Sequence, residues 1–428
     1  MTSQTPTSPP SGYLALIRGN PEFTKLWIGQ LVSYLGDWFN NVAALALVYE
    51  LTQSGMATGV WLITSTLPAF FLTPLAGVVV DRWDRRRVMI IADLARAALA
   101  LGMLLVRTPD QIWMLYAFSA ALISFSAFFQ PAQNAAIPNL VPPAQLVLAN
   151  ALSSATWGLM LAVGSAVGGI MIATVGRDVA FVINAFSFIF SAALIVWIRK
   201  SFSEARAPTL VAPATTWQEF KTGLVYLRDQ PQVLLVTLFK TGWGLAGGVF
   251  LLQTIFAQAI FQMGAAGIGW LYAARGFGVL LGPYLAQPLV RDHLGKMRRA
   301  IFAGLLLAGA SYFGFSRAPF FELAALFVVI AHIGGGTAWI LSSTILQILV
   351  PDRLRGRVFA IDFGLYTITN AFSTFLVGAA LENFDARFVG TAISTVFIGY
   401  GLVWGALVLW SQRSNPRAWG EAVGELGS

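Results

Sequence analysis

Long apolar runs alternate with short polar segments along most of the chain. A helix needs about 20 mostly apolar residues to cross the hydrocarbon core of a bilayer, and the longer runs permit tilted helices. The pattern predicts twelve spanning helices, at Phe23–Glu50, Gly59–Val80, Val88–Val106, Gln111–Gln130, Leu146–Val175, Val179–Trp197, Val233–Phe261, Gly267–Val290, Ala300–Phe315, Phe320–Leu349, Val358–Leu381 and Phe388–Trp410. We therefore expect an all-α polytopic membrane protein.

The chain ends and one central interruption divide this pattern into five parts. They are a flexible cytoplasmic tail (1–22), a six-helix bundle (23–198), a linker (199–230), a second six-helix bundle (231–411) and a C-terminal tail (412–428). The first tail lacks the basic region and short apolar core of a signal peptide. In the linker, Trp217, Phe220, Leu224 and Leu227 recur at helical spacing. This face predicts an amphipathic helix on the membrane surface, and a cytosolic linker helix is the alternative.

Composition agrees with a membrane protein and excludes several kinds of site. Hydrophobic residues make up 57% of the chain and charged residues 11%, whereas soluble domains carry about 25% charged residues. Cysteine is absent, which excludes disulfides, thiolate metal ligands and cysteine nucleophiles. The sequence lacks the H-E-x-x-H, G-x-S-x-G and phosphate-loop motifs of zinc enzymes, hydrolases and nucleotide hydrolases. We expect no enzyme, no catalytic residue, no metal and no cofactor.

The distribution of cations predicts the orientation. Twenty of the 27 Lys and Arg residues lie in the tails and in the loops that share a side with them, and four lie in the opposite loops. Because short loops rich in Lys and Arg stay inside, both termini are expected in the cytoplasm. The positive surface then faces anionic lipid of the inner leaflet. It explains the net charge of +8 without any nucleic-acid partner.

The two halves correspond at a nearly constant offset. The outer arginines Arg107 and Arg177 correspond to Arg317 and Arg387, 210 residues later. Leu-Val-Pro precedes both the fifth and the eleventh predicted span, at an offset of 209. Several matches at one offset predict two parallel six-helix repeats, with a substrate site between them near the bilayer midplane.

The segment from Gly77 to Arg87 joins the second and third spans and holds four arginines and two aspartates. It resembles the G-x-x-x-D-R/K-x-G-R-R/K signature of the major facilitator superfamily. The matching positions are Gly77, Asp81, Arg82, Arg85 and Arg86. Asp84 departs from the signature, because it stands where the family has a second glycine. The resemblance implies that Asp81 contacts the inner end of the eleventh span, near Asp362, as a latch that breaks when the inner gate opens.

A second resemblance lies in the fifth span. Gly164, Ser165, Gly168 and Gly169 resemble the G-P-x-x-G-G motif of antiporters in this superfamily, with Ser165 in place of the proline. Small residues also let helices pack closely, which is the alternative role. The run from Pro68 to Asp93 and the run from Pro351 to Val358 are most similar to the branch of enterobactin exporters and macrolide efflux proteins. That branch implies proton-driven export of a small organic molecule, such as a drug, a macrolide or a siderophore.

Ionisable residues within the spans are candidate functional groups, because charge inside a bilayer is costly. The candidates for substrate binding or proton coupling are Asp37, Asn41, Lys240, Arg275 and His332. Asp37 is the candidate proton carrier, or else a structural hydrogen-bond acceptor. It is also a plausible ion-pair partner for Lys240, and the two cations favour an anionic substrate. His332 is a possible titrating group or a structural residue. Asp93, Arg96 and Asp362 are interpreted as partners of the basic loops.

The leading hypothesis is a proton-coupled exporter in the inner membrane, working as a monomer by alternating access of the two halves. The proton gradient is its energy source, and protons, lipids and a small organic substrate are its expected partners. A lipid or lysolipid flippase, or an importer of the same fold, remains open. A membrane sensor without transport is a further alternative, which loss of the central cavity would favour.

Overall fold

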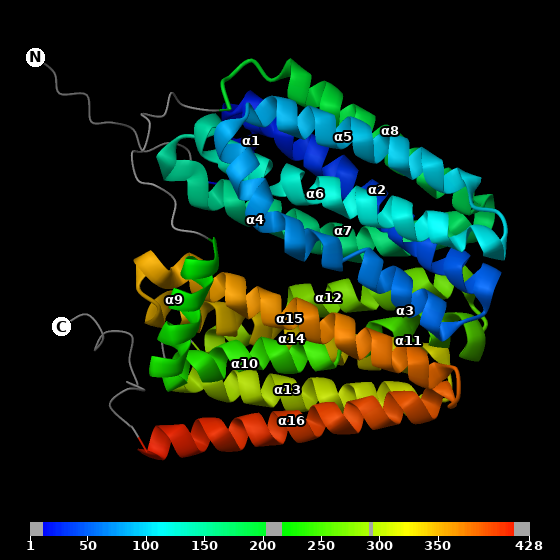
Figure 1. Ribbon diagram of the computed structural model, residues 1–428, viewed down its shortest axis with the longest axis vertical. Helices are drawn as coiled ribbons and strands as arrows, with labels where there is room; N and C mark the ends of the chain where they lie inside the picture. The colour runs from blue at the N-terminus through cyan, green and yellow to red at the C-terminus, as the bar shows by residue number, and fades with distance from the viewer. Residues whose placement is uncertain (1–11, 203–215, 291–293, 415–428) are drawn as a thin grey trace, which may run out of the picture.

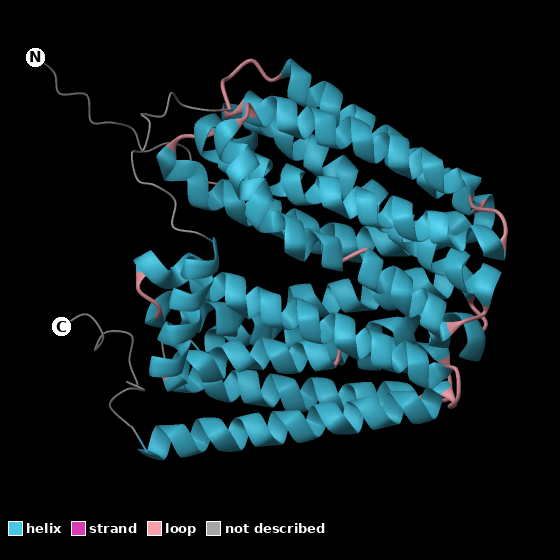
Figure 2. Cartoon of the chain, viewed as in Figure 1, coloured by secondary structure: helices cyan, strands magenta, loops and turns pink. Residues whose placement is uncertain are grey.

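The computed structural model describes residues 12–202, 216–290 and 294–414. Helices joined by short loops make up this part of the chain, and it contains no strand (Figure 2). The N-terminal half contains α1(Tyr13–Gly19), α2(Pro21–Thr52), α3(Gly55–Thr64), α4(Leu67–Arg82), α5(Arg85–Gly102), α6(Ile112–Leu140), α7(Leu146–Val175) and α8(Arg177–Trp197). The C-terminal half contains α10(Pro231–Leu245), α11(Gly248–Ile255), α12(Gly264–Val290), α13(Leu294–Arg317), α14(Phe321–Leu349), α15(Asp352–Leu381) and α16(Ala386–Ser414). The linker helix α9(Thr216–Asp229) precedes α10.

The all-α polytopic prediction is confirmed. Within the described ranges, eleven stretches are long and apolar enough to cross a membrane. The remaining predicted span is α12, a helix of 27 residues that carries six glycines and Arg275, which lower its hydropathy. It packs beside α7 and α14.

Two predicted spans are interrupted, which the apolar pattern did not predict. The second span breaks at Ser65 and Thr66 between α3 and α4, where Pro68 lacks the N–H that a continuous helix would use. The seventh breaks between α10 and α11 and ends in a π-helical turn, η4(Phe256–Ile260). Gly247 lies at that break, close to Asn370 of α15. Non-helical backbone at membrane depth is tolerated where it is buried in protein or lines a cavity.

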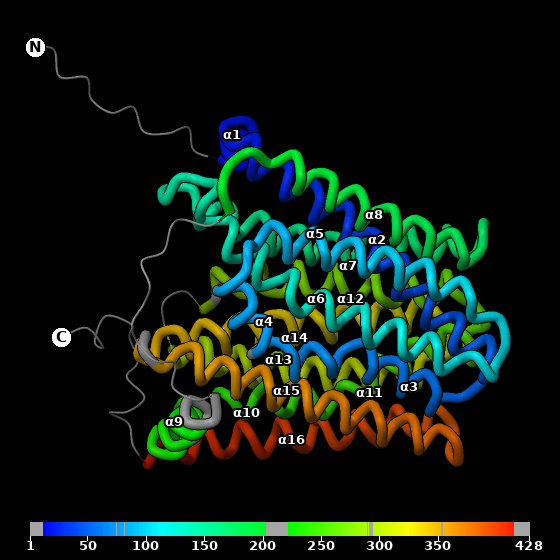
Figure 3. Tube along the Cα trace, turned by 45° about the horizontal axis from the view of Figure 1, so that its top comes forward, coloured from blue at the N-terminus to red at the C-terminus, as the bar shows by residue number. Residues whose placement is uncertain are grey.

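The two halves diverge toward the end of the molecule where α9 lies and α16 ends, which we call the terminal end, and they converge at the opposite end, the convergent end (Figure 1). Figure 3 shows the same helices in a turned view, with α9 and the last turn of α16 again at one end. The buried apolar core follows the same division. One cluster is continuous across both halves at the convergent end and includes Leu47, Trp61, Leu251 and Phe256. At the terminal end the core is split into separate N-terminal and C-terminal clusters. The structure is therefore closed at the convergent end.

The tail and the linker differ in part from expectation. Residues 13–19 of the predicted flexible tail form α1, with Leu16 fully buried. The predicted linker helix is present as α9, and it packs on α15. Leu227 is buried, whereas Leu224 is exposed. The side chains of Trp217 and Phe220 lie outside the described residues, as do residues 1–11 and 415–428.

Candidate functional site

A pocket of about 180 Å³ lies between the two halves, close to the middle of the helices that form it. The N-terminal half contributes α2 and the break between α3 and α4, and the C-terminal half contributes α11, α12 and α15. The lining residues are Trp38, Asn41, Leu62, Ser65, Thr66, Phe250, Tyr272, Arg275, Tyr366, Asn370 and Thr374. Asn41 and Arg275 were predicted from the sequence. The interruption at Ser65 and Thr66 lines this pocket, and Pro68 within an apolar run was the signal for it.

Arg275 is the cationic group of this pocket. Its guanidinium carbon lies 3.9 Å from the ring centre of Phe250 and 5.8 Å from that of Tyr272. Its Nε is buried and has no hydrogen-bond partner. Arg275 forms no ion pair with any carboxylate in the described parts of the chain. The pocket thus contains a positive charge that these residues leave uncompensated.

Asp37 lies four residues before Asn41, on the same face of α2. Its side chain is half-buried. Within residues 12–202, 216–290 and 294–414 it makes no hydrogen bond and no ion pair. The structural alternative, in which Asp37 accepts hydrogen bonds from a neighbouring helix, therefore has no donor among the described residues.

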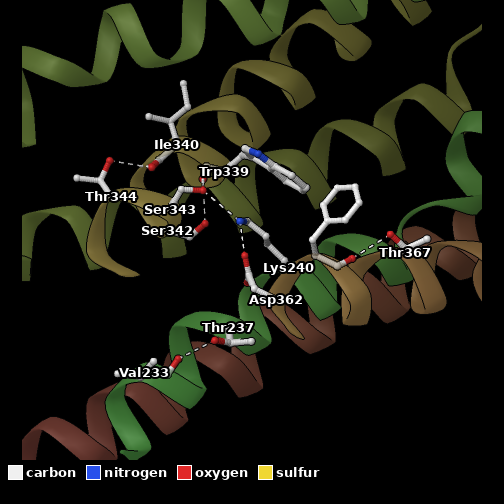
Figure 4. Close-up of polar contacts among 11 residues, drawn as sticks. Val233, Thr237, Lys240, Trp339, Ile340, Ser342, Ser343, Thr344, Asp362 and Thr367 are labelled. Carbon is white, nitrogen blue, oxygen red and sulfur yellow. Dashed lines mark hydrogen bonds and ion pairs between the residues drawn. The ribbon is translucent and has the colours of Figure 1, made fainter. Parts of the chain in front are cut away.

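The predicted pair of Lys240 and Asp37, expected in one access state and broken in the other, is absent from this conformation. Lys240 forms an ion pair with Asp362 of α15 and donates a hydrogen bond to Ser343 of α14, 3.1 Å away (Figure 4). Its Nζ also lies 4.7 Å from the ring centre of Trp339. Lys240 and Asp362 are 3% and 0% exposed, so both are sealed inside the C-terminal bundle. The pair forms because a buried charge requires a counter-charge, and it removes Lys240 from the pocket.

His332 also lies inside the C-terminal bundle. Its Nδ1 donates to the carbonyl of Val328 at 2.9 Å, which leaves Nε2 to accept from the hydroxyl of Tyr312 at 3.3 Å. Phe250 stacks on the imidazole with ring centres 6.1 Å apart. Both ring nitrogens are engaged, and His332 is 2% exposed. This geometry favours the structural role over titration.

The predicted partners of the basic loops bind elsewhere. Asp93 and Arg96 form an ion pair with each other on α5. The guanidinium of Arg96 lies between Phe129 and Phe188, with ring centres 4.4 and 4.2 Å away. This pair is buried within the N-terminal half, so the prediction that it serves the loops is corrected.

The signature loop is held within the N-terminal half. Asp84, which replaces the family's glycine, caps α5 by accepting a hydrogen bond from the backbone N–H of Arg87 at 2.8 Å. Arg85 donates to the carbonyls of Ala135 and Phe202 at 2.8 and 3.0 Å, and Arg86 donates to that of Lys200 at 2.9 Å. These bonds tie the start of α5 to α6 and to the segment that follows α8.

One residue of the predicted latch is bound elsewhere in this structure. Asp362 is engaged by Lys240 and is not available to the loop. The side chain of Asp81 lies outside the described residues. Arg82 is exposed, and a side chain added at Gly77 would meet open space. Contact between α4 and α15 is made instead where Phe70 approaches Gly364.

The antiporter-like motif on α7 forms a close contact between helices. Gly164 and Gly168 face Trp38 and Phe39 of α2. Gly169 faces α12, where an added Cβ would lie 2.8 Å from the carbonyl oxygen of Ala265. Ser165 is fully buried. The motif therefore joins α7 both to its own half and, across the interface, to the other half.

A second hollow lies on the side of the molecule, between α7 of one half and α12 and α14 of the other. Its volume is about 560 Å³, and almost all of its lining is apolar. Ala162, Val163, Trp270 and Phe277 contribute to it, and Glu322 supplies a carboxylate. We call it the lateral groove.

Comparison with known proteins agrees with this architecture. The chain is 27% identical to the MFS-type transporter YfiS of Bacillus subtilis (strain 168), over 91% of this chain and 92% of that one. It is 24% identical to the enterobactin exporter EntS of Escherichia coli O1:K1 / APEC, over 91% of each chain. The fold matches a crystal structure of a bacterial homologue of the human lysosomal transporter Spinster, in an inward-facing and unoccupied conformation. The TM-score is 0.66 at 16% identity, over 93% of this chain and 96% of that one.

The family model of the Major Facilitator Superfamily matches residues 26–361, which span most of both halves. The match includes the signature loop, the antiporter-like motif and Arg275, and it ends within α15. The chain belongs to the major facilitator superfamily and is a transporter, not an enzyme.

Proposed function

We propose that this protein is a proton-coupled exporter of a small organic molecule, which moves its substrate by alternating access of the two halves. The observation that carries the proposal is the central pocket, which both halves line and which contains the uncompensated Arg275. A site at the interface of two repeats can be exposed to either side by rocking one repeat against the other.

Asp37 is the proposed proton carrier. It stands one helical turn from Asn41 of the pocket and has no fixed partner in the described residues. Protons entering a cell at a potential of 100 mV release about 2.3 kcal/mol per charge. In this scheme the proton bound at Asp37 accompanies the return of the empty carrier.

The proposed direction of transport and the proposed membrane location are supported by different observations. Similarity to EntS, which is named as an exporter, favours outward transport. The excess of Lys and Arg on the terminal side favours cytoplasmic termini in a bacterial inner membrane. With that orientation, the structure opens toward the cytoplasm, where an exporter takes up its substrate. We propose that it acts as a monomer.

Transport by inverted membrane vesicles tests the proposal. Vesicles containing the protein are energised to acidify their interior and are offered a chemically diverse panel of labelled compounds. We expect accumulation of at least one compound, loss of accumulation with a protonophore, and proton release from the vesicles during uptake. Proton movement in the same direction as the substrate would replace antiport by symport. No accumulation of any compound would contradict export.

The lateral groove supports a second candidate function, translocation of a lipid or lysolipid. The groove opens at the side of the molecule between the halves, and its apolar lining suits an acyl chain. Movement of fluorescent phospholipid and lysophospholipid between the leaflets of proteoliposomes tests this candidate. If the protein moves lipid between the leaflets and Trp270→Ala slows this movement, lipid translocation would be favoured over export of a soluble compound.

A further inference from the structure

The central pocket has an unusual balance of charge. Arg275 lines it, whereas no Asp or Glu is among its lining residues. In the described parts of the chain, Asp37 makes no ion pair with Arg275, whereas Asp362 pairs with Lys240 and Asp93 pairs with Arg96. A cation held in a low-dielectric site needs a counter-charge, and a ligand can supply it.

The orientation of Arg275 leaves its hydrogen-bonding edge open. The guanidinium of Arg275 lies over the ring of Phe250, and Phe250 also stacks on His332. This cation–π stacking fixes the plane of the fork but uses none of its N–H groups. The planar fork of arginine matches the two oxygens of a carboxylate. Stacking therefore prepares Arg275 for an anion.

The remaining lining favours an aromatic ring of limited size. Trp38, Tyr272 and Tyr366 contribute aromatic surface from three helices. The pocket volume is about 180 Å³. An engineered cavity of about 150 Å³ holds benzene, so one substituted ring fits here. Asn41 and Asn370 each have a buried Oδ1 without a partner, which leaves amide groups for polar substituents.

We propose that the substrate is a small organic anion with an aromatic ring, whose anionic group binds Arg275 and whose ring lies among the aromatic residues. The inference rests on the proposed function for transport, but the binding can be tested without transport. Export of an anion is assisted by a negative cell interior, so the charge of this substrate agrees with the outward direction.

Binding of three matched probes to the purified full chain in detergent tests the proposal. The probes are benzoate, benzamide and benzylammonium, which share one aromatic ring and differ in charge. Isothermal titration calorimetry gives each Kd. We expect benzoate to bind at least ten-fold more tightly than the amide, and the ammonium probe to bind most weakly. Arg275→Gln should abolish the preference for benzoate over benzamide.

Two control variants make the outcome decisive. Arg275→Lys keeps the charge and loses the fork, so it should retain part of the preference. Arg317→Gln removes a cation from an exposed helix end, where it bonds Thr391, and should change none of the three constants. Equal binding of all three probes to the unaltered protein would overturn the proposal, and so would a benzoate preference that survives Arg275→Gln. The calorimetric measurement uses no proton gradient. A normal benzoate preference together with an absence of transport in vesicles would therefore count only against the proposed function.

Discussion

Lys240 and Arg275 are intramembrane cations of the same half, and their environments are opposite. Lys240 is enclosed with Asp362 and Ser343, whereas Arg275 lines the pocket without an acidic partner. The sequence marked both as candidates, because charge in a span is costly. It did not indicate which one had an internal partner, since Asp362 lies 122 residues from Lys240 and only the folded bundle brings them together.

The buried Lys240–Asp362 ion pair allows a prediction about the free energy of unfolding. Lys240→Met leaves the carboxylate of Asp362 buried without a partner, which should cost about 3–5 kcal/mol. The double variant Lys240→Met with Asp362→Leu removes both charges and should recover most of that loss. Thermal unfolding in detergent measures both. A double variant that is no more stable than the single one would show that the pair acts through more than charge compensation.

The proposed role of Asp37 predicts that its replacement uncouples substrate transport from proton movement. Asp37→Asn preserves size and polarity but cannot release a proton. We expect this variant to equilibrate substrate across the membrane and to fail to concentrate it against a gradient. Counterflow and pH-driven uptake in proteoliposomes separate the two activities. Uphill, proton-driven transport by the variant would exclude Asp37 as the proton carrier. Adding Asn41→Asp to the Asp37→Asn variant tests whether a carboxylate one helical turn away can take over this role.

Helices α7 and α12 form a close contact between the halves at the convergent end. Ala265 and Gly269 of α12 leave no space for a side chain at Gly169 of α7. The predicted small-residue motif thus has a physical consequence, because close approach of two helix backbones requires glycine there.

Gly169→Leu is expected to separate α7 from α12. Overpacking of this kind costs about 1–3 kcal/mol, and here it should also favour opening at the convergent end. Gly399→Leu is the matched control, because an added Cβ at Gly399 meets open space. Thermal unfolding and cysteine cross-linking across the interface measure the two effects. Equal behaviour of both variants would show that the contact does not hold the closed end.

A second contact at this end links α15 to α3. Glu382 accepts hydrogen bonds from the hydroxyl of Ser54 at 2.7 Å and from the backbone N–H of Met56 at 3.1 Å. These bonds hold the pKa of Glu382 below its ordinary value of 4.5. A lowered pKa means that the stabilisation is present above the ordinary value and is lost as the pH falls through the lowered value. The contact therefore persists at neutral and mildly acidic pH.

The fraction of molecules that are closed at the convergent end should therefore stay constant between about pH 8 and pH 5 and should fall in stronger acid. Glu382→Gln should weaken closure at neutral pH, because the neutral amide accepts these hydrogen bonds less strongly. Cross-linking yield between cysteines placed at Gln53 and Asn383 reports closure. Loss of closure between pH 7 and pH 5 in the unaltered protein would contradict this role and would point to a different titrating group.

The sequence predicted the type and number of these elements better than their continuity. Most predicted spans appear as single helices, since an apolar run of this length has few alternatives in a bilayer. The interruptions at Ser65 and Gly247 were missed, because hydropathy does not change where a helix breaks. Asn41 and Arg275 were predicted for the pocket, whereas Phe250 and Tyr366 were not, because aromatic residues in a span have no distinct pattern when they line a cavity.

The two halves carry related contacts as well as related sequences. Arg107 pairs with Asp178 at the start of α8, at a distance of 2.7 Å. Arg317, its counterpart in the second half, bonds Thr391 near the start of α16 at 3.1 Å. In each half the arginine ties the loop after the third span to the last helix. These equivalent contacts agree with two repeats of one six-helix unit.

Distance measurements along α7 and α12 test the account most directly. The sequence contains no cysteine, so introduced thiols can be spin-labelled without background. One pair, Val175→Cys with Met263→Cys, lies at the convergent end, and another, Val147→Cys with Leu285→Cys, lies toward the terminal end; all four sites are exposed. Pulsed electron spin resonance measures both distances before and after addition of substrate and protons. We predict that the first distance lengthens as the second shortens, whereas transport with both distances unchanged would contradict rocking of the two halves.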